Sequence, residues 1–153
     1  MIADPAVRAA VTAVFGVAAV LCVVRASGRV HDHERVGSVF HIVMCAAMVG
    51  MAWSWGTTVA VLPDSLFFGF AALWFVAVAA IYHAVMMASM AWMVVVMAVH
   101  LHDGSIVALT ALLFTGLFLA AGGYWLARWR TGIVALRELA MAAGMAAMFA
   151  MLI

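Results

Sequence analysis

Long apolar segments fill almost the whole chain, and polar residues gather at only four breaks between them. The breaks fall at residues 25–37, 56–65, 101–105 and 128–137. Apolar residues make up 71% of the 153 residues and charged residues only 8%, with no lysine. Such a chain cannot cover a water-facing surface, whereas a segment of about 20 apolar residues spans a bilayer. We therefore predict an all-α integral membrane protein in which residues 1–153 form a single transmembrane domain.

The number of spanning helices depends on residues 65–100, which contain no internal polar break. As one helix this segment would be about 54 Å long, against a hydrocarbon core of about 30 Å. We expect it to divide near residues 80–83, although Ala80, Ile81 and Tyr82 carry no turn signal. The division predicts six helices, and the alternative is five helices with one long third helix.

Arginine placement favours six helices with both termini outside. In that topology only Arg8 lies on the outer face, and the other basic residues share the inner face: Arg25, Arg29, Arg35, Arg128, Arg130 and Arg137. Five helices would place the two arginine clusters on opposite faces. Because cytoplasmic loops carry an excess of basic residues, we predict a multi-pass protein of the bacterial inner (plasma) membrane.

One pattern recurs in three of the apolar segments, at residues 41–51, 83–93 and 138–148. The segments are HIVMCAAMVGM, HAVMMASMAWM and ELAMAAGMAAM, which share [H/E]-x-x-M-x-x-x-M-x-x-M. Steps of three, four and three residues keep the four positions within about 80° of one helix face. With six helices, all three segments begin at the cytoplasmic side. The predicted fold is therefore a six-helix bundle of three pseudo-repeated helical hairpins.

Three parallel stripes that face one axis would stack their sulfur atoms in layers above a polar ring. The predicted layers are Met44, Met86 and Met141, then Met48, Met90 and Met145, then Met51, Met93 and Met148, and the ring is His41, His83 and Glu138. Three thioethers form a soft, neutral ligand set that suits Cu(I) and poorly suits Mg²⁺, Ca²⁺ or Zn²⁺. We predict that all of these residues are metal ligands, with the carboxylate of the ring neutralising a cation at the inner mouth. Small residues between them are expected to let the helix backbones approach closely.

Further donors lie beside this pattern. We predict accessory ligands at five positions: Cys45, Met87, Met97, His100 and His102. The alternative for each methionine is plain packing, because methionine at helical spacing commonly fills a core. The stripes use nine of the 13 methionines in one register, which favours the metal hypothesis.

Three functions are compatible with the pattern. We favour a Cu(I)-binding membrane protein that passes or hands over copper. The second hypothesis is a haem protein with His41 and His83 as axial ligands, and the third is a non-catalytic subunit of a larger membrane complex. The sequence shows no nucleophile–base pair, phosphate loop or nucleic-acid patch, which favours a non-enzymatic role. The expected partners are the lipid bilayer and a metal ion, without nucleic acid, and a homo-oligomer is left open.

Two resemblances add to this interpretation. The run YHAVMMASMAWM, between a His-x-x-Met helix and a Met-x-x-x-Met helix, resembles a small family of actinobacterial membrane proteins of unknown function. That resemblance covers most of the chain and implies no activity. The Met-x-x-x-Met pairs themselves resemble the pore helix of eukaryotic high-affinity copper transporters, in which three subunits stack methionine triads. This chain lacks their Gly-x-x-x-Gly motif and methionine-rich tail, so the resemblance concerns only the ligand geometry.

Overall fold

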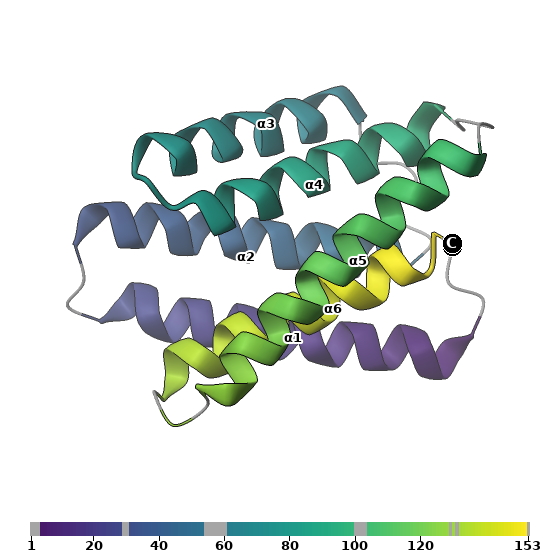
Figure 1. The fold of residues 1–153 in the computed structure, drawn as a ribbon. Helices are drawn as coiled ribbons and strands as arrows, with labels where there is room; N and C mark the ends of the chain where they lie inside the picture. The colour runs from purple at the N-terminus through teal and green to yellow at the C-terminus, as the bar shows by residue number, and fades with distance from the viewer. Residues whose placement is uncertain are drawn as a thin grey trace.

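Six helices form three antiparallel hairpins in the computed structural model, which describes residues 4–28, 31–53, 61–99, 104–128, 130 and 132–152. The helices in this described part are α1 (Pro5–Ser27), α2 (Asp32–Ala52), α3 (Val61–Ala77), α4 (Ile81–Val99), α5 (Gly104–Ala127) and α6 (Ile133–Ala150). The predicted all-α class and six-helix count are confirmed. Figure 1 shows the turns α1–α2, α3–α4 and α5–α6 at the same end of the bundle. We call this the turn end. Helices α2, α4 and α6 therefore all begin there and run parallel.

Four of the helices, α1, α2, α5 and α6, are long and apolar enough to cross a membrane. Helices α3 and α4 are also apolar but shorter, with 17 and 19 residues. At 1.5 Å per residue they reach about 26 and 28 Å, close to the hydrocarbon thickness of about 30 Å. The fold is that of a membrane protein.

The break between α3 and α4 exists, but it lies two residues earlier than predicted. Ala79 adopts a left-handed conformation with φ 58°, which is unusual for a residue other than glycine. The Ala80 amide donates to the Phe75 carbonyl at 2.8 Å, and the Ala79 amide donates to the Val76 carbonyl at 3.0 Å. These two bonds form a Schellman motif, which satisfies the last carbonyls of α3. The backbone hydrogen bonds of Ala79 and Ala80 thus end α3, although the turn contains no glycine or proline.

Helix α3 begins at Val61, two residues before Pro63. Proline is tolerated in the first helical turn, because the amides there have no carbonyl partner within the helix. Pro63 therefore lies inside the helix without breaking it.

Close backbone approaches occur within each hairpin and between α1 and α6. A Cβ atom added at Gly144 of α6 would lie 2.7 Å from Cζ of Phe15, a fully buried side chain of α1. In the described part of the chain, α2, α4 and α6 make few close backbone contacts with one another. The expectation that small residues bring these three helices together is wrong. Gly144 instead makes room for α1, and long side chains fill the space between the three parallel helices.

Polar contacts join the two ends of the first hairpin. At the turn end, Arg25 Nη2 of α1 lies 3.0 Å from Glu34 Oε2 of α2. At the opposite end, Trp53 Nε1 donates to Thr12 Oγ1 at 3.0 Å. The two contacts set the register in which α1 packs along α2.

Candidate metal site

Nine methionines from α2, α4 and α6 lie in one hydrophobic core. Eight of them are buried and Met51 is half-buried at the edge of the core. We call the set the methionine cluster, and its members are Met44, Met48, Met51, Met86, Met90, Met93, Met141, Met145 and Met148. Every stripe predicted from the sequence thus faces the interior of the bundle. Their role as metal ligands stays a prediction, since core packing would bury the same side chains.

The accessory positions divide into two groups. Cys45 and Met87 are buried in the same core as the methionine cluster. Met97 is 39% exposed and points away from that core. His100 and His102 lie outside the described residues. Only the first two positions are therefore placed where they could add a ligand to the cluster.

His41, His83 and Glu138 meet at the end of the methionine cluster nearest the turn end. His83 Nε2 lies 3.2 Å from Glu138 Oε1. The ring centroids of His41 and His83 are 4.8 Å apart, with the ring planes almost perpendicular. His41 and Glu138 are buried, whereas His83 keeps about a fifth of its side chain exposed. Three side chains from three helices are thus brought to one level.

Hydrogen bonds determine which ring nitrogens remain for a ligand. His41 Nδ1 lies 2.6 Å from the Gly37 carbonyl oxygen, and because a carbonyl only accepts, Nδ1 must carry the proton. His41 Nε2 then presents a lone pair, and it is buried without a hydrogen-bond partner among the described residues. His83 Nε2 donates to the Glu138 carboxylate, so the neutral form of His83 has its unprotonated nitrogen at Nδ1. Histidines that bind metals are oriented in this way, by a carbonyl or carboxylate on the second nitrogen.

Glu138 is already held by Arg137, the residue that precedes it. Arg137 Nε donates to Glu138 Oε1 at 3.1 Å, and Nη2 contacts the same oxygen. A carboxylate bound by a guanidinium is largely neutralised before a cation arrives. Among the residues that the structure describes, no three His, Cys, Asp or Glu side chains stand in a metal-holding group. The geometry thus gives Glu138 a role in orienting His83, and its role as a metal ligand stays a prediction.

The same contacts bear on the haem hypothesis. The His41 and His83 rings touch edge to face, and Phe75 stacks on the His83 ring at 5.4 Å. Two axial ligands must instead stand apart on opposite faces of a macrocycle. The haem hypothesis has no support from this geometry.

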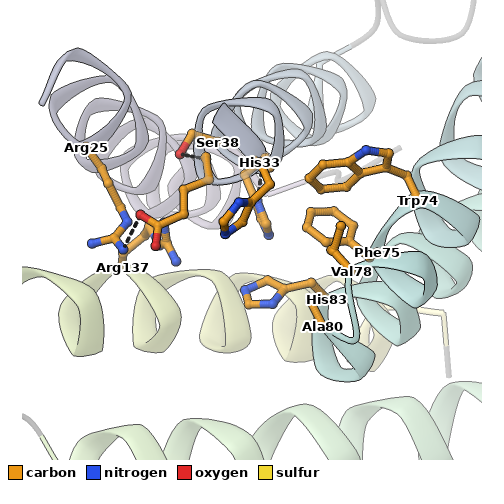
Figure 2. Close-up of a pocket in the computed structure, with 12 residues that line it drawn as sticks. Arg25, His33, Ser38, Trp74, Phe75, Val78, Ala80, His83 and Arg137 are labelled. Carbon is orange, nitrogen blue, oxygen red and sulfur yellow. Dashed lines mark hydrogen bonds and ion pairs between the residues drawn. The ribbon is translucent and has the colours of Figure 1, made fainter. Parts of the chain in front are cut away.

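A pocket of about 270 Å³ opens beside the two histidines at the turn end. Figure 2 shows Arg25 and Arg137 on one side of it, and Trp74 and Phe75 of α3 on the other. His83 lies between these two walls, and His41 also lines the pocket. The pocket thus lies at the turn end, beside the two histidines.

Comparison with known protein families places this arrangement in a family without an assigned activity. Residues 33–152 match a domain of unknown function (DUF5134). The chain belongs to this family. The matched region contains all three methionine stripes and both histidines of the candidate site, while α1 precedes it. The expected membership of an uncharacterised family is confirmed, whereas no resemblance to copper transporters is found.

Similar proteins occur in mycobacteria. The chain is 38% identical over 65 aligned positions to uncharacterised proteins of Mycobacterium bovis and Mycobacterium tuberculosis. The alignment covers 35% of this chain and 31% of each relative. The matched part spans about a third of the length of these curated relatives. No solved structure matches the chain.

Four groups at the site were not identified from the sequence as parts of it. The Gly37 carbonyl could have been found, because it lies four residues before His41 on the same helix. Arg137 is adjacent to Glu138, and this proximity signalled a possible ion pair. Trp74 and Phe75 come from α3, which contains no copy of the repeated pattern. Their contribution depends on how the second hairpin packs, which no local signal reveals.

Proposed function

We propose that the protein binds Cu(I) within the bacterial plasma membrane and passes or hands it over along the methionine cluster. The observation that supports this most is the common burial of nine thioethers from three parallel helices. The two histidines stand at the polar end of this cluster with one unprotonated nitrogen each. Sulfur and imidazole nitrogen are ligands that suit Cu(I).

The electrostatics of the cluster suit a monovalent, soft ion. A bare cation in a hydrocarbon interior is very costly unless ligands replace its water. Thioethers replace that water without adding charge, so a Cu(I) complex with them keeps a single positive charge. Successive weak sites of similar affinity also let an ion move on instead of holding it. The cluster extends from Met44, one turn beyond His41, to Met51, so such sites would follow one another along the helices.

Arginine positions support the orientation of this path. Arg25, Arg35, Arg128, Arg130 and Arg137 all lie at the turn end of the described structure. Arg8 lies near the start of α1, at the opposite end. Cytoplasmic segments carry the excess of arginine, so the turn end is the cytoplasmic side. The histidines would then form the cytoplasmic mouth of the copper path.

Titration of the purified protein with Cu(I), against a chelator of known affinity and without oxygen, tests the proposal. The variant Met44→Leu/Met86→Leu/Met141→Leu removes the sulfur atoms nearest the histidines while nearly conserving side-chain volume. We expect it to bind Cu(I) at least about tenfold more weakly, which corresponds to about 1.4 kcal/mol. The matched control is Met97→Leu/Met151→Leu, because these two methionines are 39% and 43% exposed and lie outside the cluster.

The control should bind like the wild type. Equal affinity of the triple variant and the wild type would show that the thioethers only pack the core. The absence of any Cu(I) binding to the wild type would overturn the proposed function altogether.

A further inference from the structure

The pocket at the turn end is too large for an ion alone. It encloses about 270 Å³, whereas about 10–15 Å³ measured in the same way is enough for one water molecule. Pockets for small molecules begin at about 300 Å³. The pocket is slightly below this range, so it has room for a molecule smaller than a drug-sized ligand next to the proposed copper mouth.

The two walls of the pocket differ in chemistry. One wall carries the guanidinium groups of Arg25 and Arg137, and the other carries the rings of Trp74 and Phe75 (Figure 2). The Glu34 carboxylate, which pairs with Arg25, also lines the pocket. Each guanidinium is paired with one carboxylate, but a guanidinium has five N–H donors and these pairs use only part of them. The remaining donors suit a negatively charged group on a molecule in the pocket.

His41 is one of the residues that line the pocket. His41 is only 2% exposed, and its Nε2 atom is itself buried and has no hydrogen-bond partner among the described residues. A ligand in the pocket therefore reaches Nε2 only if the side chains around it move slightly. A buried nitrogen without a hydrogen-bond partner costs free energy, so a ligand that supplies such a partner binds more tightly. Nε2 can accept a proton donor or bind a metal ion. Under the proposed function, that ion is Cu(I).

We propose that the pocket receives a small anionic thiol, which exchanges Cu(I) with His41 Nε2. This proposal rests on the proposed function, and it identifies the molecule that exchanges copper at the histidines. A soft ion leaving the protein needs a soft ligand, and a thiolate is a stronger ligand for Cu(I) than a thioether or an imidazole. The negative charge of the thiol compound is held by Arg25 and Arg137, which places its sulfur near the histidines.

The exchange needs no oxidant or reductant. The thiol first loses its proton to water, and the thiolate sulfur then donates an electron pair to the copper ion. The Cu–S bond forms while the Cu–Nε2 bond breaks, and the imidazole keeps its electron pair. Copper remains Cu(I) throughout. Transfer toward the thiol is downhill, because its ligand is the stronger one.

Removal of Cu(I) from the loaded protein by three thiols of similar size tests this proposal. Mercaptoacetate carries a carboxylate, 2-mercaptoethanol is neutral outside its thiol, and cysteamine carries an ammonium group. At equal thiolate concentrations and low ionic strength, we expect mercaptoacetate to remove copper at least about tenfold faster than cysteamine, because fixed charges at a cleft raise rates by about 10–10³. Glycolate, which has the carboxylate without the thiol, should slow removal by mercaptoacetate, and ethanolamine should not.

Arginine variants separate the pocket from the general charge of the protein. Arg25→Gln should lower the ratio of the mercaptoacetate rate to the cysteamine rate at least threefold. Arg35→Gln makes the same charge change on an exposed residue that does not line the pocket, and it should leave the ratio unchanged. Intrinsic differences between the thiols cancel in this comparison.

An unchanged ratio in Arg25→Gln, or an equal effect of both variants, would overturn the pocket proposal while Cu(I) binding itself stands. No effect of glycolate would overturn it in the same way, without depending on the folding of any variant. A protein that never loads Cu(I) would instead overturn the proposed function. The two failures are therefore distinguishable.

Discussion

Replacing Ala79 with glycine should stabilise the protein, because this residue holds the turn between α3 and α4 in a left-handed conformation. Its φ is 58°, where a Cβ atom costs about 1–2 kcal/mol that glycine avoids. Glycine also loses more conformational freedom on folding, which costs about 0.5–1 kcal/mol and offsets part of this gain. Ala79 is exposed, so no packing is lost. The net expectation for Ala79→Gly is a gain of about 0–1.5 kcal/mol in the free energy of unfolding, with a midpoint of about 0.75 kcal/mol.

Ala77→Gly is the matched control, since Ala77 is equally exposed and is the last residue of α3. Glycine inside a helix costs about 0.5–1 kcal/mol, so the two variants should differ by about 1–2 kcal/mol and in sign. Equilibrium unfolding in mixed micelles, followed by circular dichroism while the fraction of sodium dodecyl sulfate rises, measures both. If residues 65–100 formed one continuous helix, both substitutions would destabilise it to a similar extent. Equal losses would therefore refute the turn.

Two further substitutions test the packing of α1 by the same unfolding measurement. Gly144→Ala should cost about 1–3 kcal/mol, because its Cβ would lie 2.7 Å from the buried Phe15 ring. The control Gly116→Ala on α5 meets no atom within 4 Å and should be neutral or stabilising. Equal effects of the two substitutions would mean that α1 does not pack closely on α6. Thr12→Val should cost about 1 kcal/mol, because it removes the acceptor of the Trp53 indole N–H at 3.0 Å. An unchanged free energy of unfolding would show that this contact does not stabilise the hairpin of α1 and α2.

The class of the protein and its helix count were predictable because they depend on sums over many residues. The total apolar length limits how many helices of bilayer length the chain can form, and arginine placement favours six helices over five. The spacing of His41 and His83 ahead of their methionines was enough to predict that they lie level. Each of these signals lies in the order of residues along the chain and needs no knowledge of how the helices pack.

Features that depend on neighbouring helices could not be predicted in the same way. The turn at Ala79 has no glycine or proline, so only its hydrogen bonds reveal it. The sequence also does not show that Arg137 and His83 both bind the Glu138 carboxylate. The room that Gly144 leaves for Phe15 also belongs to a pair of helices far apart in the sequence. These are tertiary contacts, and periodicity alone carries no information about them.

X-ray absorption at the copper K-edge of the Cu(I)-loaded protein is the most direct test of the central claim that thioethers bind the metal. The account predicts sulfur in the first coordination shell of the wild type. In the variant Met44→Leu/Met86→Leu/Met141→Leu, the sulfur contribution should fall. In the control Met97→Leu/Met151→Leu, it should equal that of the wild type. A shell of nitrogen and oxygen alone in the wild type, or an unchanged sulfur contribution in the triple variant, would contradict the account.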